Sequence, residues 1–318
     1  MHTTSILNPI ILLCPGQGAQ AIGMGKAWFD ASPAAQAVYA EAAQVLGFDL
    51  AKLSFEGPAE VLNKTDSAQA AIYTASVAAY RGLLEKGLLS ATDLKATAGL
   101  SLGEFTALHL AGAFSFADGL RLVRLRGQAM QAAAEAGQGT MVALTGDGIE
   151  TAAAGLCDQA RQGGILVPAN YNSPMQVVAS GDPAACARVA EAAGAAGFKA
   201  TALTVAGAFH SDLMKPAADK LAAAIEQTAW NLPKATVLSN VSGVAHVTDI
   251  ATIKKSLIAQ LTSPVRWSQS MQWSAQNLPG RYVELAPGKV LSGLMRRTVK
   301  ELKVENFDAP PAPPQAAA

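Results

Sequence analysis

The chain has 318 residues, of which 50% are apolar, 15% are charged and 6% are aromatic. Since a typical domain has ~150 residues, this length predicts one large domain with an insertion or two domains. The apolar fraction can form a sizeable core and excludes an intrinsically disordered chain. The 24 basic residues balance the 24 acidic ones, which argues against nucleic-acid or membrane binding through overall charge.

The cysteines and histidines indicate neither a disulfide framework nor a metal site. Cys14, Cys157 and Cys186 are odd in number and far apart, which favours a reducing compartment. The four histidines form no metal-binding motif, so we expect no metal. No apolar run approaches the ~20 residues that cross a bilayer. We therefore expect a cytoplasmic protein that is not attached to a membrane.

The first elements in the chain are typical of the start of a parallel α/β sheet. A buried strand is expected at 10–14, followed by the loop PGQGAQ at 15–20 and a helix at 24–31. Further along, the pattern predicts an alanine-rich helix at 67–87, a strand at 95–99 and an amphipathic helix at 118–134.

The pattern changes near residue 137, where the elements follow the order βαββαβ of a ferredoxin-like unit. The expected strands are 140–145, 165–169, 176–179 and 200–205, with helices at 149–162 and 183–196. We interpret 137–206 as an inserted small subdomain. The sheet-forming pattern then resumes, with strands near 236–239 and 282–285.

This organisation assigns 1–136 and 207–308 to a discontinuous catalytic subdomain with a parallel-sheet core. Residues 309–318 contain only Ala, Pro and Gln. Because such a segment has no large apolar side chain to bury, we expect it to be a disordered tail.

The strongest local motif is Gly99-Leu100-Ser101-Leu102-Gly103, a GxSxG sequence between a predicted strand and a predicted helix. The tight turn forces the serine into a strained conformation, and the glycines let other segments approach closely. We expect the Ser101 hydroxyl at the carboxyl end of the sheet, with the N–H of Leu102 donating to an oxyanion. The alternative is a glycine-rich turn with an ordinary capping serine.

A serine nucleophile needs a base, and the positions of the histidines favour His210. It follows a strand and a glycine, and it comes after the serine in chain order, as in α/β-hydrolases. His109 lies on the serine's own helix and points away, while His246 lies in a polar turn. No aspartate stands out as a third triad member, so we expect a backbone carbonyl to orient His210. Alternatively, His210 is a buried residue that only satisfies a hydrogen bond.

Arg126 lies on the apolar face of the predicted 118–134 helix, beside Leu122, Ala129, Met130 and Ala133. A guanidinium in such surroundings is costly unless an anion pairs with it. Two partners remain open. One is a structural Glu or Asp, and the other is a substrate carboxylate held by the two-pronged contact that lysine cannot reproduce.

Together these motifs resemble the malonyl-CoA:acyl carrier protein transacylases of fatty-acid and polyketide synthesis, over residues 12–308. The resemblance rests on PGQGAQ at 15–20, GLSLGE at 99–104, RLRGQAM at 124–130, NSPMQVV with SG at 172–181, AFHS at 208–211, QLTSPVRW at 260–267 and ELAPG at 284–288. It implies an α/β-hydrolase-like parallel-sheet core with a ferredoxin-like insertion. Leu100 replaces a histidine found in many members, and Ala19 replaces a common serine; we expect both changes to be tolerated.

The resemblance also assigns a role to each site residue. Malonyl-CoA would acylate Ser101, and the phosphopantetheine thiol of an acyl carrier protein would then attack the ester, with His210 as the base in both steps. Gln17 and the N–H of Leu102 would form the oxyanion hole. Arg126 would bind the malonyl carboxylate, and the main-chain carbonyl of Gln260 would orient the histidine.

Phe209, directly before the predicted base, would lie beside the acyl chain. The resemblance associates Ala-Phe-His at this point with malonyl selection, since the ring would overlap an α-methyl group. The alternative is that Phe209 only packs in the core.

The implied partners are malonyl-CoA and an acidic acyl carrier protein, with no cofactor, and we expect a monomer. Candidates for a basic docking patch are Arg296, Arg297, Lys300 and Lys303. One rival function is an acyl hydrolase that edits carrier-bound chains; Arg126 argues against it, because a simple acyl chain has no carboxylate. The other rival is a non-catalytic docking module, which the joint presence of Ser101, His210, Arg126 and Gln17 disfavours.

Overall fold

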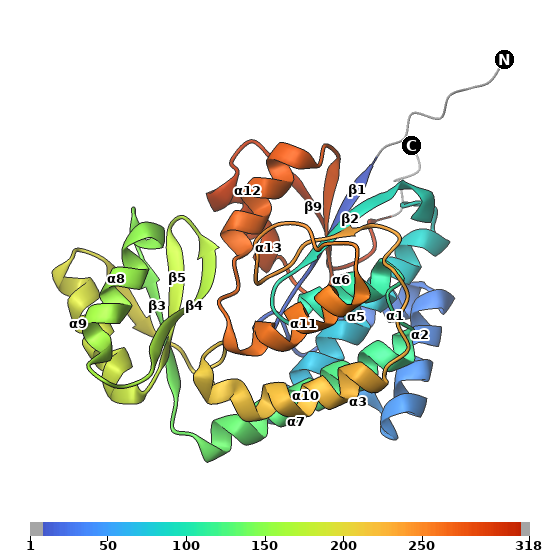
Figure 1. The fold of residues 1–318 in the computed structure, drawn as a ribbon. Helices are drawn as coiled ribbons and strands as arrows, with labels where there is room; N and C mark the ends of the chain where they lie inside the picture. Colours follow the sequence, from blue (N-terminus) through green and yellow to red (C-terminus); the bar gives the residue numbers. More distant parts are fainter. Residues whose placement is uncertain (1–8, 313–318) are drawn as a thin grey trace.

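The computed structural model describes residues 9–312, and a five-stranded parallel sheet lies at its centre (Figure 1). The strand order is β7-β2-β1-β8-β9. The bounds are β1 Ile10–Cys14, β2 Leu94–Gly99, β7 Thr236–Val237, β8 Arg281–Leu285 and β9 Val304–Phe307. The four strands expected outside the small subdomain are confirmed. The short strand β9 is half exposed and carries no clear apolar pattern, so the sequence did not predict it.

Both faces of this sheet are buried, which explains why β1 is a continuous apolar run. Side chains alternate along a strand, so Ile10 and Leu12 join one core cluster while Ile11 and Leu13 join another. The smaller cluster packs on α12 (Trp267–Asn277) and α13 (Val290–Thr298). The larger cluster draws on α1 Lys26–Ala31, α2 Pro33–Leu46, α3 Leu50–Glu56, α4 Ala59–Leu62, α5 Thr65–Glu85, α6 Gly103–Leu110, α7 Phe116–Ala136, α10 Lys215–Gln227 and α11 Ile250–Ala259.

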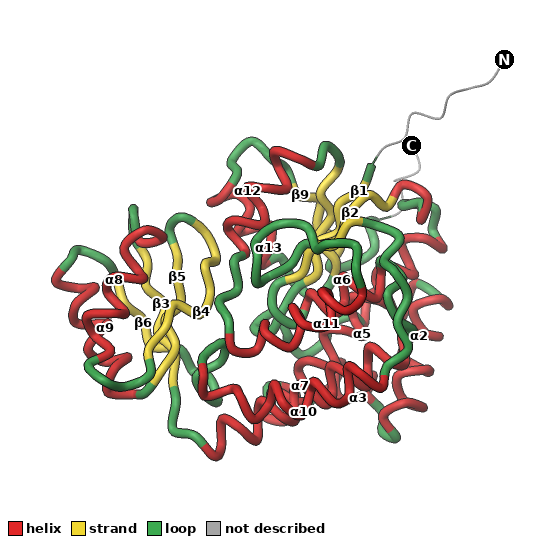
Figure 2. The backbone as a smooth tube through the Cα atoms, in the orientation of Figure 1, coloured by secondary structure: helices red, strands yellow, loops and turns green. Residues whose placement is uncertain are grey.

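The small subdomain has its own antiparallel sheet, with the order β4-β5-β3-β6, on the left of the view in Figure 2. Its elements are β3 Thr140–Thr145, α8 Ile149–Arg161, β4 Leu166–Ser173, β5 Gln176–Gly181, α9 Pro183–Ala195 and β6 Lys199–Ala202. One face of the sheet packs on the two helices through Leu144, Val177 and Ala179. On the other face, Met141 and Val178 join the core of the larger unit. The chain is therefore an α/β-hydrolase-like core with a ferredoxin-like insertion.

Backbone hydrogen bonds join β4 to the segment around Val265 in the larger unit. The N–H of Tyr171 donates to the carbonyl of Val265 at 2.9 Å, and the N–H of Val265 donates to the carbonyl of Ala169 at 2.8 Å. The N–H of Arg266 donates to the carbonyl of Asn240 at 2.9 Å. These bonds fix the small subdomain beside the carboxyl ends of β1 and β2.

Some predicted boundaries differ from the structure for local reasons. The helix expected from residue 24 begins at Lys26, because Gly23 and Gly25 have φ values of 90° and 77°. β4 continues to Ser173 because pairing with β5 extends to Gln176. The expected disordered tail lies largely outside the described residues, and 309–312 belong to no helix or strand. Within residues 9–312, no helix is both long and apolar enough to span a bilayer.

The turn after β2 packs so closely that two of its residues must be glycine. A Cβ on Gly103 would overlap the carbonyl oxygen of Cys14, and a Cβ on Gly99 would overlap the backbone of Gly103. Backbone atoms cannot move aside as a flexible side chain can. The spacing of the GxSxG motif therefore follows from the contact between β1, β2 and α6.

We expect Gly103→Ala to destabilise the fold by ~1–3 kcal/mol, because the methyl group overpacks this contact. Gly155→Ala in α8 is a matched control, since a Cβ there meets no heavy atom within 4 Å and alanine is favoured over glycine in a helix by ~1 kcal/mol. Thermal unfolding of both variants should show a lower Tm for Gly103→Ala only. Equal shifts would contradict the packing argument.

Candidate active site

Ser101 occupies the turn between β2 and α6 in a left-handed conformation, with φ 52°. A non-glycine residue rarely adopts this conformation, and it persists only where surrounding contacts hold it. Two side chains supply those contacts. The N–H of Ser101 donates to Oδ1 of Asn240 at 2.6 Å, and Nε2 of Gln260 donates to the carbonyl of Ser101 at 2.9 Å.

The Ser101 hydroxyl lies against His210, which also has a positive φ, 57°. The distance from Oγ to Nε2 is 2.8 Å. Nδ1 of His210 lies 2.8 Å from the main-chain carbonyl of Gln260. A carbonyl can only accept, so Nδ1 carries the proton and Nε2 is left to accept from the serine hydroxyl. This is a serine–histidine dyad in which a carbonyl takes the place of an aspartate.

Burial lowers the pKa of His210 to about 4. The side chain is 3% exposed, and the positive charge of Arg126 lowers the pKa further, while the hydrogen bond to Gln260 opposes the shift. The imidazole is therefore neutral near pH 7. In that state Nε2 can take a proton from the serine.

Arg126 is only 1% exposed and reaches the same hydroxyl from α7. Nη2 donates to Oγ of Ser101 and to Oε1 of Gln260, both at 3.0 Å. Nη1 donates to Oε1 of Gln69 at 2.8 Å. The guanidinium carbon lies 5.5 Å from the centre of the Phe105 ring.

The Arg126 guanidinium has an N–H group that no acceptor in the described residues contacts. Across residues 9–312, no carboxylate lies within ion-pair distance of Arg126, and its buried Nε has no partner. Burial lowers the pKa of Arg126 to about 10, and the negative charge of Glu104 partly offsets this. Among residues 9–312, therefore, no structural Glu or Asp pairs with Arg126. The carboxylate of a ligand could occupy that position.

Ser101 and His210 open into a cavity of about 620 Å³ between the two subdomains, and Arg126 reaches its edge through the Ser101 hydroxyl. Ser101, His210, Phe209 and Gln17 line it, and β4 and β5 contribute Asn170, Asn172 and Val178 to the opposite wall. Leu100 also lines it. Phe209 is 7% exposed, so its ring both closes the cavity and packs in the core.

Gln17 lines this cavity and Leu102 directly follows Ser101, and the loops after β1 and β2 that carry them touch. In the parallel pairing Cys14 is opposite Gly99, and the N–H of Leu100 donates to the carbonyl of Cys14 at 3.1 Å. The backbone N–H groups of Gln17 and Leu102 donate to no other residue in the described part of the chain. An oxyanion hole requires free N–H groups of this kind.

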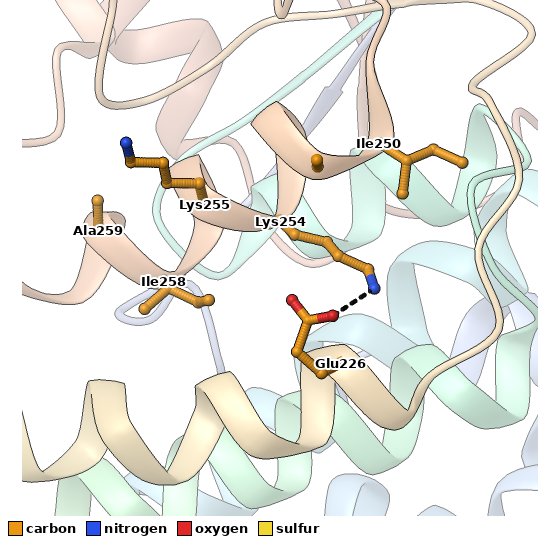
Figure 3. Close-up of a pocket in the computed structure, with 7 residues that line it drawn as sticks. Glu226, Ile250, Lys254, Lys255, Ile258 and Ala259 are labelled. Atoms are coloured by element: carbon orange, nitrogen blue, oxygen red, sulfur yellow. Dashed lines mark hydrogen bonds and ion pairs between the residues drawn. The ribbon is translucent and has the colours of Figure 1, made fainter.

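A second hollow, of about 570 Å³, lies between α10 and α11 (Figure 3). It is lined by Glu226, Ile250, Ala251, Lys254, Lys255, Ile258 and Ala259, and Nζ of Lys254 donates to Glu226 at 2.9 Å. Ser101, His210 and Arg126 do not border this hollow.

The other histidines have different surroundings. Nδ1 of His109 contacts the carbonyl of Phe114 at 3.0 Å, and His109 does not reach the cavity. His246 was expected in a turn but follows the β-bridge between Leu238 and Ala245. Its side chain is 4% exposed and lies 2.6 Å from Oε1 of Glu104. Within residues 9–312, no three His, Cys, Asp or Glu side chains are grouped as metal ligands are.

Four residues of this site were not expected from the sequence: Gln69, Glu104, Asn240 and His246. Asn240 contacts Ser101 across 139 positions, and Gln69 contacts Arg126 across 57. No local pattern marks such pairs. Glu104 was visible at the end of GLSLGE, but nothing in that motif showed what it would bind.

The chain matches a family model described as "Acyl transferase domain" over residues 11–313. It is 42% identical over 300 residues to the malonyl CoA-acyl carrier protein transacylase of Escherichia coli, covering 94% of this chain and 95% of that one. With the Bacillus subtilis protein of the same name it shares 41% identity over 298 residues, covering 93% and 92%.

Solved structures give the same result. An acyl carrier protein S-malonyltransferase from Vibrio cholerae superposes with a TM-score of 0.89 at 42% identity, covering 95% of this chain and 97% of that one. A malonyl-transacylase solved in complex with a type II PKS acyl-carrier protein also has a TM-score of 0.89, at 38% identity, covering 95% and 96%.

The low pKa of His210 predicts that Ser101 stays reactive in mild acid. The base works only when unprotonated, and its pKa is lowered from 6.5 to about 4, so the acid limb should lie nearer pH 4 than pH 6.5. Labelling of Ser101 by a fluorophosphonate reagent, followed against pH, measures this limb. Arg126→Met should move it upward, because the lost positive charge holds the pKa down. A wild-type limb at pH 6.5 would contradict the account.

Proposed function

The chain belongs to the acyl transferase domain family and transfers a malonyl group from malonyl-CoA to an acyl carrier protein, and we propose that it does so through an ester on Ser101. The observation that carries this proposal is the contact of one serine hydroxyl with both a neutral histidine at 2.8 Å and a buried arginine at 3.0 Å. The histidine can take the hydroxyl proton. The arginine can hold the carboxylate that distinguishes malonyl from a simple acyl group.

In the first half-reaction, Oγ of Ser101 attacks the thioester carbonyl of malonyl-CoA as Nε2 of His210 takes its proton. The oxyanion of the tetrahedral intermediate accepts hydrogen bonds from Gln17 and from the N–H of Leu102. Collapse breaks the C–S bond, and the proton on His210 passes to the departing CoA thiolate. The main-chain carbonyl of Gln260 holds Nδ1 throughout and stabilises the imidazolium.

In the second half-reaction, the phosphopantetheine thiol of the carrier protein enters the position that CoA has left. His210 takes the thiol proton, the sulfur attacks the ester carbonyl, and the C–O bond to Ser101 breaks with return of the proton to Oγ. The two half-reactions mirror each other, so one base and one oxyanion hole are sufficient.

Arg126 binds the malonyl carboxylate in this proposal. Its unpartnered Nε and the absence of a contacting carboxylate among residues 9–312 support this role. When the carboxylate arrives, Nη2 can exchange its contact with Ser101 for one with the substrate. That exchange frees the serine oxygen for attack.

The proposal also covers the cofactor, the location, the oligomeric state and the subdomains. The chemistry needs no metal and no redox cofactor, and we place the protein in the cytoplasm as a monomer. Residues 1–136 and 207–308 act as the catalytic subdomain, while 137–206 form one wall of the cavity. The basic side chains Arg296 and Arg297 at the end of α13 remain candidates for contact with the carrier protein.

Arg126→Ala should selectively impair the use of malonyl-CoA. Removing the partner of a desolvated carboxylate should cost ~2–5 kcal/mol in kcat/KM, whereas acetyl-CoA has no carboxylate to lose. The measurement is kcat/KM for transfer to carrier protein from each donor.

Arg124→Ala is the matched control for this variant, because Arg124 lies on the same helix but pairs with Asp66 at 2.9 Å, whereas Arg126 contacts the Ser101 hydroxyl. It should leave the malonyl-to-acetyl ratio unchanged. An equal loss with both donors in Arg126→Ala would show that Arg126 has only a structural role.

Phe209 should exclude an α-methyl group from the acyl site, because its ring closes the cavity next to His210. Phe209→Ser should raise methylmalonyl transfer relative to malonyl by ~1–3 kcal/mol in the ratio of specificity constants. Phe209→Leu, with intermediate volume, should fall between the two. An unchanged ratio in a folded Phe209→Ser variant that still uses malonyl-CoA would sink this assignment.

A further inference from the structure

Glu104 is a buried acid that takes no part in the steps above. It lies in the first turn of α6, three residues after Ser101, and is 0% exposed. A carboxylate in such a place is strongly unfavourable unless hydrogen bonds and opposite charge compensate it. Its oxygens accept from Nε2 of Gln260 at 2.6 Å and from the N–H of Asn240 at 3.3 Å, and Nε2 of His246 lies at 2.6 Å.

The contact with Gln260 connects Glu104 to both groups that act on the serine hydroxyl. Arg126 can only donate, so the Gln260 amide must turn its oxygen to the guanidinium and its NH₂ group to Glu104 and the carbonyl of Ser101. The main-chain carbonyl of the same residue binds His210. A shift of Gln260 would therefore misplace the base and the guanidinium together.

The contact with Asn240 connects Glu104 to the strained turn itself. The Asn240 amide brackets this turn, because Oδ1 accepts from the N–H of Ser101 at 2.6 Å and Nδ2 donates to the carbonyl of Gly99 at 2.7 Å. Its backbone N–H donates to Glu104. The same carboxylate thus holds the two side chains that keep Ser101 in its left-handed conformation.

His246 encloses the remaining oxygen of Glu104. The backbone N–H of His246 donates to the carbonyl of Val237 at 2.8 Å. This bond holds the segment after β7 next to that strand. The negative charge of Glu104 also supports the charged form of Arg126 from behind, without contacting it. The Gln260 amide therefore connects the Arg126 guanidinium to the Glu104 carboxylate through two hydrogen bonds.

We propose that Glu104 is a positioning residue for the transfer reaction, which sets His210 and Arg126 on the Ser101 hydroxyl through Gln260 and Asn240, with His246 holding it in place. The inference rests on the proposed acyl-serine mechanism. It differs from a merely structural role in what it predicts for the chemical step. A structural role alters the fraction of folded enzyme, whereas a positioning role alters the rate constant of acylation.

The test is single-turnover acylation of the full chain by excess malonyl-CoA, followed by rapid quenching and intact-mass measurement. The amplitude reports the competent fraction and the first-order rate constant reports the chemical step. Glu104→Gln keeps the size of the side chain but removes its charge. Because a displacement of ~1 Å at a reacting group costs ~100-fold, we expect a rate constant ~10–100-fold lower with an amplitude close to that of wild type.

Two further variants complete the test. His246→Gln retains a donor to Glu104 and should lower the rate constant less, by ~3–10-fold; it decides the matter if Glu104→Gln does not fold. Glu284→Gln is the matched control, because Glu284 is equally buried but binds the backbone of Leu291 and Ser292 at the start of α13. It should lower the Tm and leave the rate constant unchanged.

The outcomes separate this inference from the proposed function. If wild-type enzyme forms no malonyl adduct on Ser101, the proposed mechanism fails and the positioning role falls with it. If wild type is acylated and Glu104→Gln reacts at the wild-type rate constant, whatever its amplitude, only the positioning role is overturned. For a Glu104→Gln variant that does not fold, an unchanged rate constant in His246→Gln has the same consequence.

Discussion

A guanidinium buried without a contacting carboxylate among residues 9–312 is the constraint on which the rest of the site depends. Arg126 is 1% exposed, and the side chains that contact it through hydrogen bonds are neutral: Ser101, Gln69 and Gln260. Its charge is therefore only partly compensated in the free protein, and in the proposed mechanism a substrate anion completes the compensation. The same charge lowers the pKa of His210, so in that mechanism one buried cation would serve both substrate selection and the state of the base.

The position of Ser101 next to this cation depends on small residues in the backbone around it. Glycines at 99 and 103 let the turn after β2 fit between β1 and α6. Within that turn Ser101 is held in a left-handed conformation, and Asn240 and Gln260 secure it from segments more than 130 positions away. Local strain at the serine is thus maintained by contacts that form only when the whole fold is assembled.

Much of the fold could be predicted from residue patterns, because β1 is a continuous apolar run and the small subdomain alternates strands and helices in an unmistakable order. The GxSxG motif marked Ser101, and elimination among four histidines marked His210. The helical spacing around Arg126 predicted that it is buried. The roles of Gln17 and Gln260 came from resemblance to a family and not from any local pattern.

The hydrogen bonds that join Glu104 to Asn240, Gln260 and His246 could not be predicted in the same way. Glu104, Asn240 and His246 are ordinary polar residues in the sequence, and their meaning comes from contacts that span 136 to 142 positions. His246 illustrates this limit, since a polar turn was expected there but the burial of its side chain against Glu104 was not. Periodicity describes which face of an element is buried, whereas such hydrogen bonds depend on how distant elements meet.

The most direct test of the central claim is to locate the covalent intermediate. Wild-type enzyme and Ser101→Ala would be incubated briefly with malonyl-CoA in the absence of carrier protein, digested, and mapped by peptide mass spectrometry. The account predicts a malonyl ester on the peptide that contains Ser101 in wild type and no adduct in Ser101→Ala. A malonyl group on another residue, or transfer to carrier protein that persists in Ser101→Ala, would contradict it.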